Sequence, residues 1–585
     1  MHTNLRSFIK LLEREKEIVE VKAEVDPYLE LAEIHRRVIE EGGPALLFTK
    51  VKGSRFPVVT NLFGTERRVT LATGTRPEEL VKKAVSALDR LLPPKPKTLW
   101  GERKWLLDFA RAGLKRVPRT KAPVMEFREN KVNLKEFPAL TGWQEDGGPF
   151  FTLPLVYTED PVTREHNLGM YRMQIFSENQ TGMHWQIQKG GGFHHYEAEK
   201  LGCPLPVTVF LGGPPALILA AIAPLPEMLP ELIFASFLIG KKLNLVDPGN
   251  HPHALVAEAE FAICGEVPPK VRRPEGPFGD HYGYYSLIHD FPVFNVKQIY
   301  RRKDAIYPAT VVGKPRQEDY YIGEFLQRLL SPMFPVVMPG VKELWTYGET
   351  GFHALAAARV RESYHREAMA HALRIMGEGQ LTLTKFLMVT DAPCELPKFS
   401  QLLENILKRF NPARDLLIIS NTSTDTLDYT GRKFNEGSKA IMTGLGEPIR
   451  NLPHEYGGGP LHKIKKVKPY CGGCLMISGE TFEKEAGLAS EIVKREQEKL
   501  AEWPLVVLVD DAAVIHDQTS FLWTVFTRFD PAHDIYADAA IRNNKIEYRG
   551  PIVIDARMKP FYPDELIPRE DIVKRVSERW SELFR

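Results

Sequence analysis

The sequence predicts a multidomain protein of the α/β and β classes, with α/β domains on either side of a central β-rich domain. With 585 residues, the chain is too long for one compact core, so two to four domains are expected. Short apolar runs separated by Gly, Pro and Asp turns fill residues 150–310, as in a barrel or a sandwich. Apolar helices and strands alternate before and after that region, which is typical of α/β domains.

The expected boundaries follow these changes of pattern. We expect an N-terminal α/β domain at 1–115, a β domain at 116–312, a C-terminal α/β domain at 313–475 and an α/β extension at 476–585. In the first domain, Asp26 and Pro27 predict the start of a helix whose apolar face runs through 31–38. A second helix is expected at 75–92, and the prolines of 93–96 end it.

Composition and charge are those of an ordinary soluble protein. Apolar residues make up 43% and charged residues 26%, and 77 Lys plus Arg against 75 Asp plus Glu give a net charge of +2. The most apolar stretch, 207–239, is broken by Gly, Pro and Glu, so it lacks the roughly 20 apolar residues of a spanning helix. Residues 1–20 contain no signal-peptide core. We therefore expect a cytoplasmic protein with no transmembrane segment and no nucleic-acid partner.

The central region contains five expected strands. They span 153–158, 168–176, 206–211, 254–267 and 291–300. In the second strand, alternation puts Arg172 and Gln174 on one face and Tyr171, Met173 and Ile175 on the other. A strand arginine that points into a barrel mouth can pair with carboxylates or hold an anionic ligand. The alternative is an exposed strand charge.

The C-terminal part contains an internal repeat. A strand at 386–390, a helix at 398–410 and a strand at 416–420 predict a βαβ unit. Residues 505–511 resemble 386–391, and the sequence RFDPAHD at 528–534 repeats RFNPARD at 409–415. We therefore expect a partial duplication of the βαβ unit, which adds a structural layer or a contact between protomers.

Residues 275–281, which read Glu-Gly-Pro-Phe-Gly-Asp-His, are the strongest candidate for a catalytic loop. Its glycines and proline give a tightly turned backbone that could hold Glu275 and Asp280 close together. Two close carboxylates do not both ionise cheaply, so one tends to keep a proton near neutral pH and can act as a general acid. The alternative is a solvated turn with two ordinary surface acids.

The cysteines predict no disulfide framework, because there are only five and they are scattered. Cys471 and Cys474 form the only close pair in the sequence. They could be half of a zinc site with His454 and His462, but the spacing matches no zinc pattern. A Gly-rich turn with two reduced thiols is the favoured interpretation.

The loop at 275–281 resembles the signature loop of the UbiD family of decarboxylases. The segment 167–174, Asn-Leu-Gly-Met-Tyr-Arg-Met-Gln, resembles a second family motif. Three further segments agree with the family in order: 305–307 with 312–315, 384–386, and 409–415. The resemblance implies a central split β-barrel that binds prenylated FMN, with a divalent metal, usually Mn²⁺, and K⁺ nearby.

The resemblance also assigns roles to individual residues. It implies a catalytic trio of Arg172, Glu275 and Asp280, with Asp280 as the acid that gives a proton to the substrate carbon. It implies that the metal is bound by Asn167, Gln188 and Glu231, and that Lys385 lies beside the flavin. Gln188 stands where the family has a histidine, so His184 and His194 are alternative ligands.

We expect Arg172 to keep Glu275 ionised. Charge repulsion and burial should then raise the pKa of Asp280 and leave it a proton to give. Many relatives have Glu at the position of Asp280, and that side chain is one methylene longer. Aspartate is also common there, so the assignment is unaffected.

The expected activity is the reversible, non-oxidative decarboxylation of an aromatic, hydroxyaryl carboxylic acid. The long C-terminal extension and residues 521–528 resemble members linked to menaquinone synthesis by the futalosine route, whose substrate would be 1,4-dihydroxy-6-naphthoate or its prenylated form. The alternatives are a 3-polyprenyl-4-hydroxybenzoate decarboxylase of ubiquinone synthesis, a flavin-binding subunit of a multi-component carboxylase, and a scaffold without turnover. The resemblance implies a flavin prenyltransferase as cofactor supplier and a homo-oligomer, dimeric or hexameric. The intact Arg172, Glu275 and Asp280 argue against the scaffold.

Overall fold

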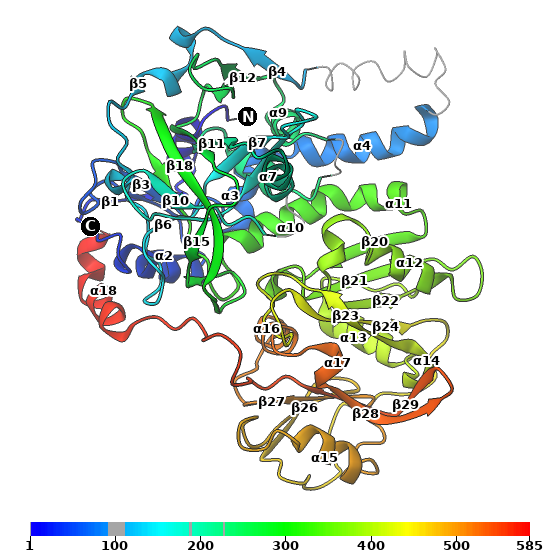
Figure 1. Cartoon of the computed structure of the whole chain (residues 1–585). Coiled ribbons are helices and arrows are strands. Elements are labelled where there is room, and N and C mark those ends of the chain that lie inside the picture. Colours follow the sequence, from blue (N-terminus) through cyan, green and yellow to red (C-terminus); the bar gives the residue numbers. More distant parts are fainter. Residues whose placement is uncertain (1, 92–110, 187–189, 226–228, 585) are drawn as a thin grey trace. The chain divides into compact units, whose positions relative to one another are not determined.

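The computed structural model describes residues 2–91, 111–186, 190–225 and 229–584 (Figure 1). These residues form two compact units. Unit 1 comprises Met1–Leu329 together with Asp564–Arg585, and unit 2 comprises Leu330–Pro563. Unit 1 therefore combines the first two expected domains with the end of the chain, and each unit is described by itself.

The N-terminal part of unit 1 is an α/β layer. Its sheet has the order β1-β2-β3-β19, with β1 at Ile18–Val21, β2 at Ala45–Phe48, β3 at Val58–Thr60 and β19 at Tyr307–Pro308. Its helices are α1 (Leu5–Arg14), α2 (Glu30–Glu40), α3 (Glu66–Thr73) and α4 (Arg76–Leu91).

The start of α2 differs from the prediction. Asp26 accepts a hydrogen bond from Tyr28 N in a turn, and Leu29, at φ 64°, separates this turn from the helix.

A large sheet forms the centre of unit 1. Its order is β10-β18-β14-β11-β7-β8, and β5 and β15 also pair with β18. The strands are β5 (Phe127–Arg128), β7 (Leu155–Glu159), β8 (His166–Met170), β10 (Gln180–Gly182), β11 (Leu205–Leu211), β14 (Phe261–Val267), β15 (Arg272–Glu275) and β18 (His289–Arg301). The pairings among the described residues follow an open path, and none closes the sheet into a barrel.

The expected strand 168–176 is interrupted at Tyr171 and Arg172. Before the break, β8 pairs with β7; after it, β9 (Met173–Gln174) pairs with β6 (Phe150–Phe151) in a separate two-stranded sheet. The chain therefore changes sheets here. Arg172 is released from ladder pairing, and its side chain can turn toward the loop that follows β15.

One apolar core joins the N-terminal sheet of unit 1, the first, to its large central sheet, the second. Phe48 of the first sheet, Phe261 and Phe294 of the second, and Tyr307 of β19 are all fully buried in it. Burying aromatic side chains is the largest favourable term available to such a core. This shared core explains why the first two expected domains form one compact unit.

Unit 2 contains two five-stranded sheets with the same topology. Their orders are β20-β21-β22-β24-β23 and β25-β26-β27-β29-β28, and in each sheet the two outer pairs are antiparallel and the two inner pairs parallel. The first contains β20 (Val341–Thr346), β21 (Leu355–Val360), β22 (Phe386–Thr390), β23 (Leu416–Ser423) and β24 (Glu436–Gly444). The second contains β25 (Lys466–Cys471), β26 (Cys474–Ser478), β27 (Leu505–Val509), β28 (Ile535–Arg542) and β29 (Lys545–Asp555).

The repeated sequence segments occupy matching places in these sheets. In 409–415 and 528–534, the short helices α14 (Pro412–Asp415) and α17 (Pro531–Asp534) lead directly into β23 and β28. Asp415 accepts from Asn411 N at 2.9 Å, and Asp534 accepts from Asp530 N at 2.8 Å. The predicted βαβ unit needs a correction: β22 and β23 are not neighbours, because β24 inserts between them and pairs in parallel with β22.

The end of the chain returns to unit 1. Helix α18 (Glu570–Leu583) buries Ile572, Val576 and Leu583 in the core of that unit, beside α2. The prediction placed all of 476–585 in one extension, but its last residues pack with an element more than 500 positions earlier. No local sequence pattern predicts contact between segments so far apart in the chain.

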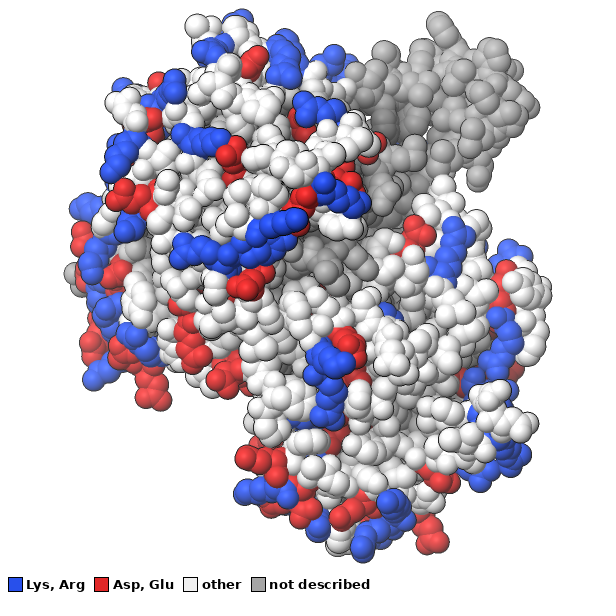
Figure 2. All heavy atoms as spheres, in the orientation of Figure 1, with Lys and Arg blue, Asp and Glu red and all other residues white. Residues whose placement is uncertain are grey.

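No helix among the described residues is long and apolar enough to cross a membrane. On the face drawn in Figure 2, basic and acidic side chains are interspersed and form no large patch of a single sign. This distribution agrees with the balanced charge of the sequence.

Candidate functional site

The loop after β15 has its backbone fixed on all sides. Its N–H groups donate as follows: Gly276 to Gln174 Oε1 at 2.9 Å, Phe278 to Ser286 Oγ at 3.2 Å, Gly279 to Asp146 Oδ1 at 2.8 Å and Asp280 to Tyr284 O at 3.0 Å. Pro277 has no N–H, and its carbonyl accepts from Gly147 N at 2.8 Å. The loop is therefore a rigid mount for the side chains of Glu275 and Asp280.

Asp146 connects this loop to the segment at 142–143. Its Oδ2 accepts from Gly142 N at 2.8 Å and from Trp143 N at 2.9 Å, while its Oδ1 holds Gly279 N. The Trp143 ring packs so closely on the loop that a Cβ on Gly279 would lie 2.1 Å from its Cδ1. Glycine is required at 279 for this approach, and burial raises the pKa of Asp146 to about 6.

Arg172 joins the two carboxylates of the loop. Its Nε lies 3.3 Å from Glu275 Oε1, its Nη1 forms an ion pair with Asp280 Oδ2, and its Nη2 donates to Ser286 Oγ at 2.9 Å. The guanidinium carbon also lies 4.6 Å from the centre of the Phe278 ring. The planar fork of arginine suits this arrangement, since it can serve several acceptors at once.

Glu275 is a fully buried anion, and its two carboxylate oxygens have different surroundings. Its Oε1 receives Arg172 Nε and lies 2.9 Å from His184 Nδ1, whereas its Oε2 has no hydrogen-bond partner among the described residues. Burial alone would raise the pKa of Glu275. Together, His184 and Arg172 outweigh burial and hold this pKa below its usual value.

Asp280 is also ionised. Burial alone would raise its pKa, but Arg172 and then His281 hold the pKa of Asp280 well below its usual range. Its Oδ1 accepts from His281 N at 2.7 Å and lies 2.6 Å from His281 Nδ1. The expected pairing of Arg172 with an ionised Glu275 is present. The expected rise in the pKa of Asp280 is wrong, because the guanidinium reaches both carboxylates.

Two of the three expected metal ligands lie together. Glu231, the first residue of α9 (Glu231–Ile239), accepts from the backbone N–H of Leu168 at 3.1 Å, beside Asn167. Helix α7 (Gly190–Leu201) begins so close that a Cβ on Gly190 would lie 2.2 Å from Asn167 Oδ1. Gln188 lies outside the described residues.

The alternative histidine ligands have other partners. His184 bonds Glu275, as described above, and His194 Nδ1 lies 2.9 Å from Thr158 Oγ1. Within the described ranges, no three His, Cys, Asp or Glu side chains are grouped to hold a metal ion, and the zinc interpretation of Cys471 and Cys474 gains no support. All five cysteines are free thiols. Cys471 and Cys474 are cross-strand partners in the β25–β26 hairpin.

Lys385 belongs to unit 2 and is almost fully buried. Its Nζ lies 2.9 Å from Asp428 Oδ2 and 3.3 Å from Thr430 Oγ1. Lys439 is nearby in the same group, where burial lowers its pKa to about 8. The expected role of Lys385 beside a flavin stays a proposal.

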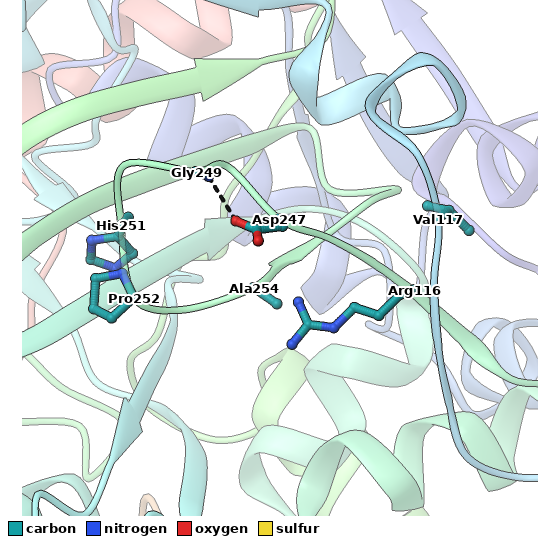
Figure 3. A pocket seen from close by; sticks show the side chains of 7 residues that line it. All are labelled: Arg116, Val117, Asp247, Gly249, His251, Pro252 and Ala254. Atoms are coloured by element: carbon teal, nitrogen blue, oxygen red, sulfur yellow. Dashed lines mark hydrogen bonds between the residues drawn. The ribbon is translucent and has the colours of Figure 1, made fainter.

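A cavity of about 580 Å³ lies elsewhere in unit 1 (Figure 3). It is lined by residues of 116–117 and 247–254 and contains none of the expected site residues. Its acidic side chain, Asp247, already accepts from Gly249 N at 2.7 Å, as the dashed line shows. We therefore place the candidate site at Arg172 and not in this cavity.

Comparison with known families identifies the family of the chain. Three domains described for 3-octaprenyl-4-hydroxybenzoate carboxy-lyase match the chain: the N-terminal domain at 9–88, the Rift-related domain at 115–315, and the C-terminal domain at 320–444 and 464–556. The chain belongs to the UbiD family of carboxy-lyases. The resemblance inferred from the sequence is thereby confirmed.

One relative from Chlamydia spans nearly the whole chain, and two solved structures span most of it. A Chlamydia pneumoniae protein, named as one subunit of a 4-hydroxybenzoate decarboxylase, is 52% identical over 99% of this chain and 98% of its own. Vanillic acid decarboxylase of Sedimentibacter hydroxybenzoicus, in closed form, has a TM-score of 0.68 at 23% identity, over 85% of this chain and 100% of its own. An evolved dimeric form of the UbiD-class enzyme HmfF from Pelotomaculum thermopropionicum, in complex with prFMN, has a TM-score of 0.62 at 24% identity, over 77% and 97%. The two structures show a shared multidomain α/β fold.

Four residues that build the site were not predicted from the sequence in these roles. Gln174 and Asp146 fix the loop backbone, Ser286 links it to Arg172, and His184 was considered only as a metal ligand. Of these, only Gln174 carried a signal, since alternation placed it on the face of Arg172. The others act through contacts between segments far apart in the chain, which no local pattern predicts.

Replacing Asp146 with Asn should loosen the loop at Gly279. Asparagine keeps one acceptor oxygen, but its NH₂ group faces a backbone N–H where Asp146 has its second oxygen. The hydrogen bonds on that side of residue 146, one side of the clamp that Asp146 forms on the loop, are therefore lost, which costs about 1–3 kcal/mol of loop stability. Hydrogen–deuterium exchange of the 277–284 segment should therefore become faster. A variant of the exposed neighbour, Glu145→Gln, is the control, and unchanged exchange in Asp146→Asn would contradict the clamp.

The same clamp should weaken in mild acid. The folded-state pKa of Asp146, about 6, lies above its ordinary value of 3.8, so its ionisation costs global stability above pH 6, and this cost fades as pH falls. Protonation nevertheless turns one acceptor oxygen into a donor. After correction for the intrinsic exchange rate, protection of the loop should fall through pH 6 in the wild type but not in Asp146→Asn, without global unfolding.

Proposed function

We propose that the chain is a reversible, non-oxidative decarboxylase of a hydroxyaryl carboxylic acid that uses prenylated FMN. The observation that carries this proposal is one guanidinium, Arg172, joined to two carboxylates on a loop whose backbone is fixed throughout. Membership of the UbiD family supplies the reaction class. The arrangement offers what decarboxylation needs from the protein: an anion-binding cation and a proton donor.

Arg172, Asp280 and Glu275 have different roles in this proposal, and the roles follow from their charges. An aromatic carboxylate that approaches Arg172 competes with Asp280 for the guanidinium. As that ion pair loosens, the pKa of Asp280 rises, because burial is no longer outweighed. Asp280 can then hold a proton and give it to the carbon that has lost carbon dioxide. Glu275 stays ionised through His184 and keeps Arg172 in place.

The residues near Asn167 fit a phosphate-bound hard cation. Asn167 and Glu231 offer an amide and a carboxylate oxygen, which Mn²⁺ accepts, and Gln188 would add a second amide. The close approach of Gly190 to the Asn167 side chain leaves no room for a side chain at residue 190. Prenylated FMN, when bound, supplies an electron sink for the substrate carbon. Lys385 would balance its negative charge, with K⁺ close by.

The substrate class follows from the relatives. The name of the Chlamydia pneumoniae protein supports a hydroxybenzoate-type acid. The long C-terminal extension favours 1,4-dihydroxy-6-naphthoate or its prenylated form, in the menaquinone futalosine route, and 3-polyprenyl-4-hydroxybenzoate of ubiquinone synthesis is the alternative. A flavin prenyltransferase would supply the cofactor, and we propose a homo-oligomer in the cytoplasm.

A second candidate is a flavin-binding subunit of a multi-component aryl carboxylase or decarboxylase. The observation in its favour is that a relative 52% identical over nearly the full length is named as one subunit of a decarboxylase. Activity of the purified chain alone decides between the two candidates. A chain that binds the cofactor but turns over only after a second polypeptide is added would favour this second candidate.

Protein produced without a flavin prenyltransferase should be inactive, because ordinary FMN lacks the electrophilic ring that the reaction needs. Loading with prenylated FMN should restore carbon dioxide release from one of three acids: 4-hydroxybenzoate, its 3-polyprenyl derivative or 1,4-dihydroxy-6-naphthoate. Full activity with unmodified FMN, or without flavin, would refute the cofactor assignment.

Glu231→Gln should reduce retention of Mn²⁺ and flavin more than Gln188→Ala does. A charged oxygen is the stronger ligand for a hard cation, so its loss should weaken the anchor more than loss of a neutral amide. Metal and flavin content per chain measure this directly. If Gln188→Ala loses both while Glu231→Gln keeps them, the ligand assignment is wrong.

A further inference from the structure

Asp280 needs a proton source, because decarboxylation consumes one proton in each turnover. The substrate carboxylate leaves as carbon dioxide, and its bond to carbon is replaced by a bond to hydrogen. The proton comes from Asp280, which is left as a carboxylate. With its side chain only 10% exposed, Asp280 has little direct access to water. Arg172 also favours its ionised form, so it does not hold a stored proton at rest.

His281 bridges Asp280 and solvent. Its Nδ1 lies 2.6 Å from Asp280 Oδ1, and its backbone N–H holds the same oxygen at 2.7 Å, which fixes the ring against the carboxylate. The side chain of His281 is 27% exposed, so it is the more accessible member of the pair. Imidazole is the side chain best suited to exchange protons with water near neutral pH.

A third titratable group, Asp319, acts on this pair electrostatically. Asp319, in the first turn of α10 (Glu318–Leu330), interacts electrostatically with both His281 and Asp280, attracting the imidazolium and repelling the carboxylate. Its Oδ1 is buried and has no hydrogen-bond partner among the described residues. Asp319 is therefore a buried carboxyl group with one oxygen able to accept a further hydrogen bond, and burial raises its pKa.

We propose that His281 carries protons between solvent and Asp280, and that Asp319 is the positioning residue that stabilises its charged form. After Asp280 has given its proton to carbon, the His281 imidazolium gives its Nδ1 proton to Asp280 Oδ1. The neutral ring then takes a proton from water. In the carboxylation direction, the same steps run in reverse and release one proton.

The pH dependence follows from the groups around the ring. They include Asp280 and Tyr282 on the loop, Arg172, which shares Asp280, and Asp319 on α10. Removing the negative charge of Asp319 makes the imidazolium less stable. The alkaline limb of kcat should therefore move to lower pH in Asp319→Asn, with KM and flavin content unchanged.

The relay rests on the proposed decarboxylase function, and its test uses the holoenzyme. His281→Ala should lower kcat by roughly 10²-fold, the lower end of the range for acid–base catalysis, with little change in KM. Added imidazole should restore much of the rate, because a free base can occupy the space of the lost ring. A purely structural role would show no such rescue.

The matched control is His462→Ala. His462 is also a half-buried histidine bonded to a carboxylate, Glu491 at 3.0 Å, but it precedes the second sheet of unit 2 and its bonds are to residues of that region. The control should keep the wild-type rate and show no response to imidazole.

Wild-type kcat in His281→Ala, or a loss that imidazole does not relieve although flavin content is normal, would overturn the relay. If His281→Ala does not fold, the alkaline limb in Asp319→Asn decides the question, and an unmoved limb overturns the proposal. Failure of the wild-type holoenzyme to release carbon dioxide would instead count against the proposed function.

Discussion

The site depends on the charge of Arg172. Two carboxylates on one loop, Glu275 and Asp280, are removed from water, which is costly without a counter-charge. A single guanidinium serves both and also holds Ser286. In the mechanism that we propose, the same cation also receives the anionic substrate, so its pairing with Asp280 is the contact that substrate binding would change. The resting protein keeps Asp280 ionised, and in this proposal the bound substrate creates the conditions under which Asp280 takes up a proton.

This interaction requires accurate placement of Arg172 and of the loop, which the path of the backbone and the side chains around the loop provide. The change of sheets between β8 and β9 frees Arg172 to leave the ladder. The N–H groups of the opposing loop donate hydrogen bonds to Gln174, Ser286 and Asp146, which fix the loop. Holding reacting groups in position before substrate arrives avoids an entropic cost at the moment of reaction. Close packing on Gly279 contributes to the same end, since any side chain there would displace the loop.

Local patterns predicted much of this architecture. The strand predicted at 386–390 matches β22 to the residue, and the repeat at 409–415 and 528–534 corresponds to matching positions in two sheets. The three residues that the family resemblance assigns to the catalytic trio do meet. The failures share one cause, which is contact between distant segments. The insertion of β24, the return of α18 to unit 1 and the ionised state of Asp280 each depend on a partner that the surrounding sequence does not reveal.

The central claim, that Asp280 delivers the proton under the control of Arg172, is tested most directly by exchange of the product's ring hydrogen with deuterated water. Exchange uses the acid but requires no net loss of carbon dioxide. Asp280→Asn keeps the shape of the side chain and removes its transferable proton, so it should retain flavin and lose exchange by about 10²–10⁴-fold. An Asp280→Asn holoenzyme that exchanges at the wild-type rate would contradict the account and place the proton donor elsewhere.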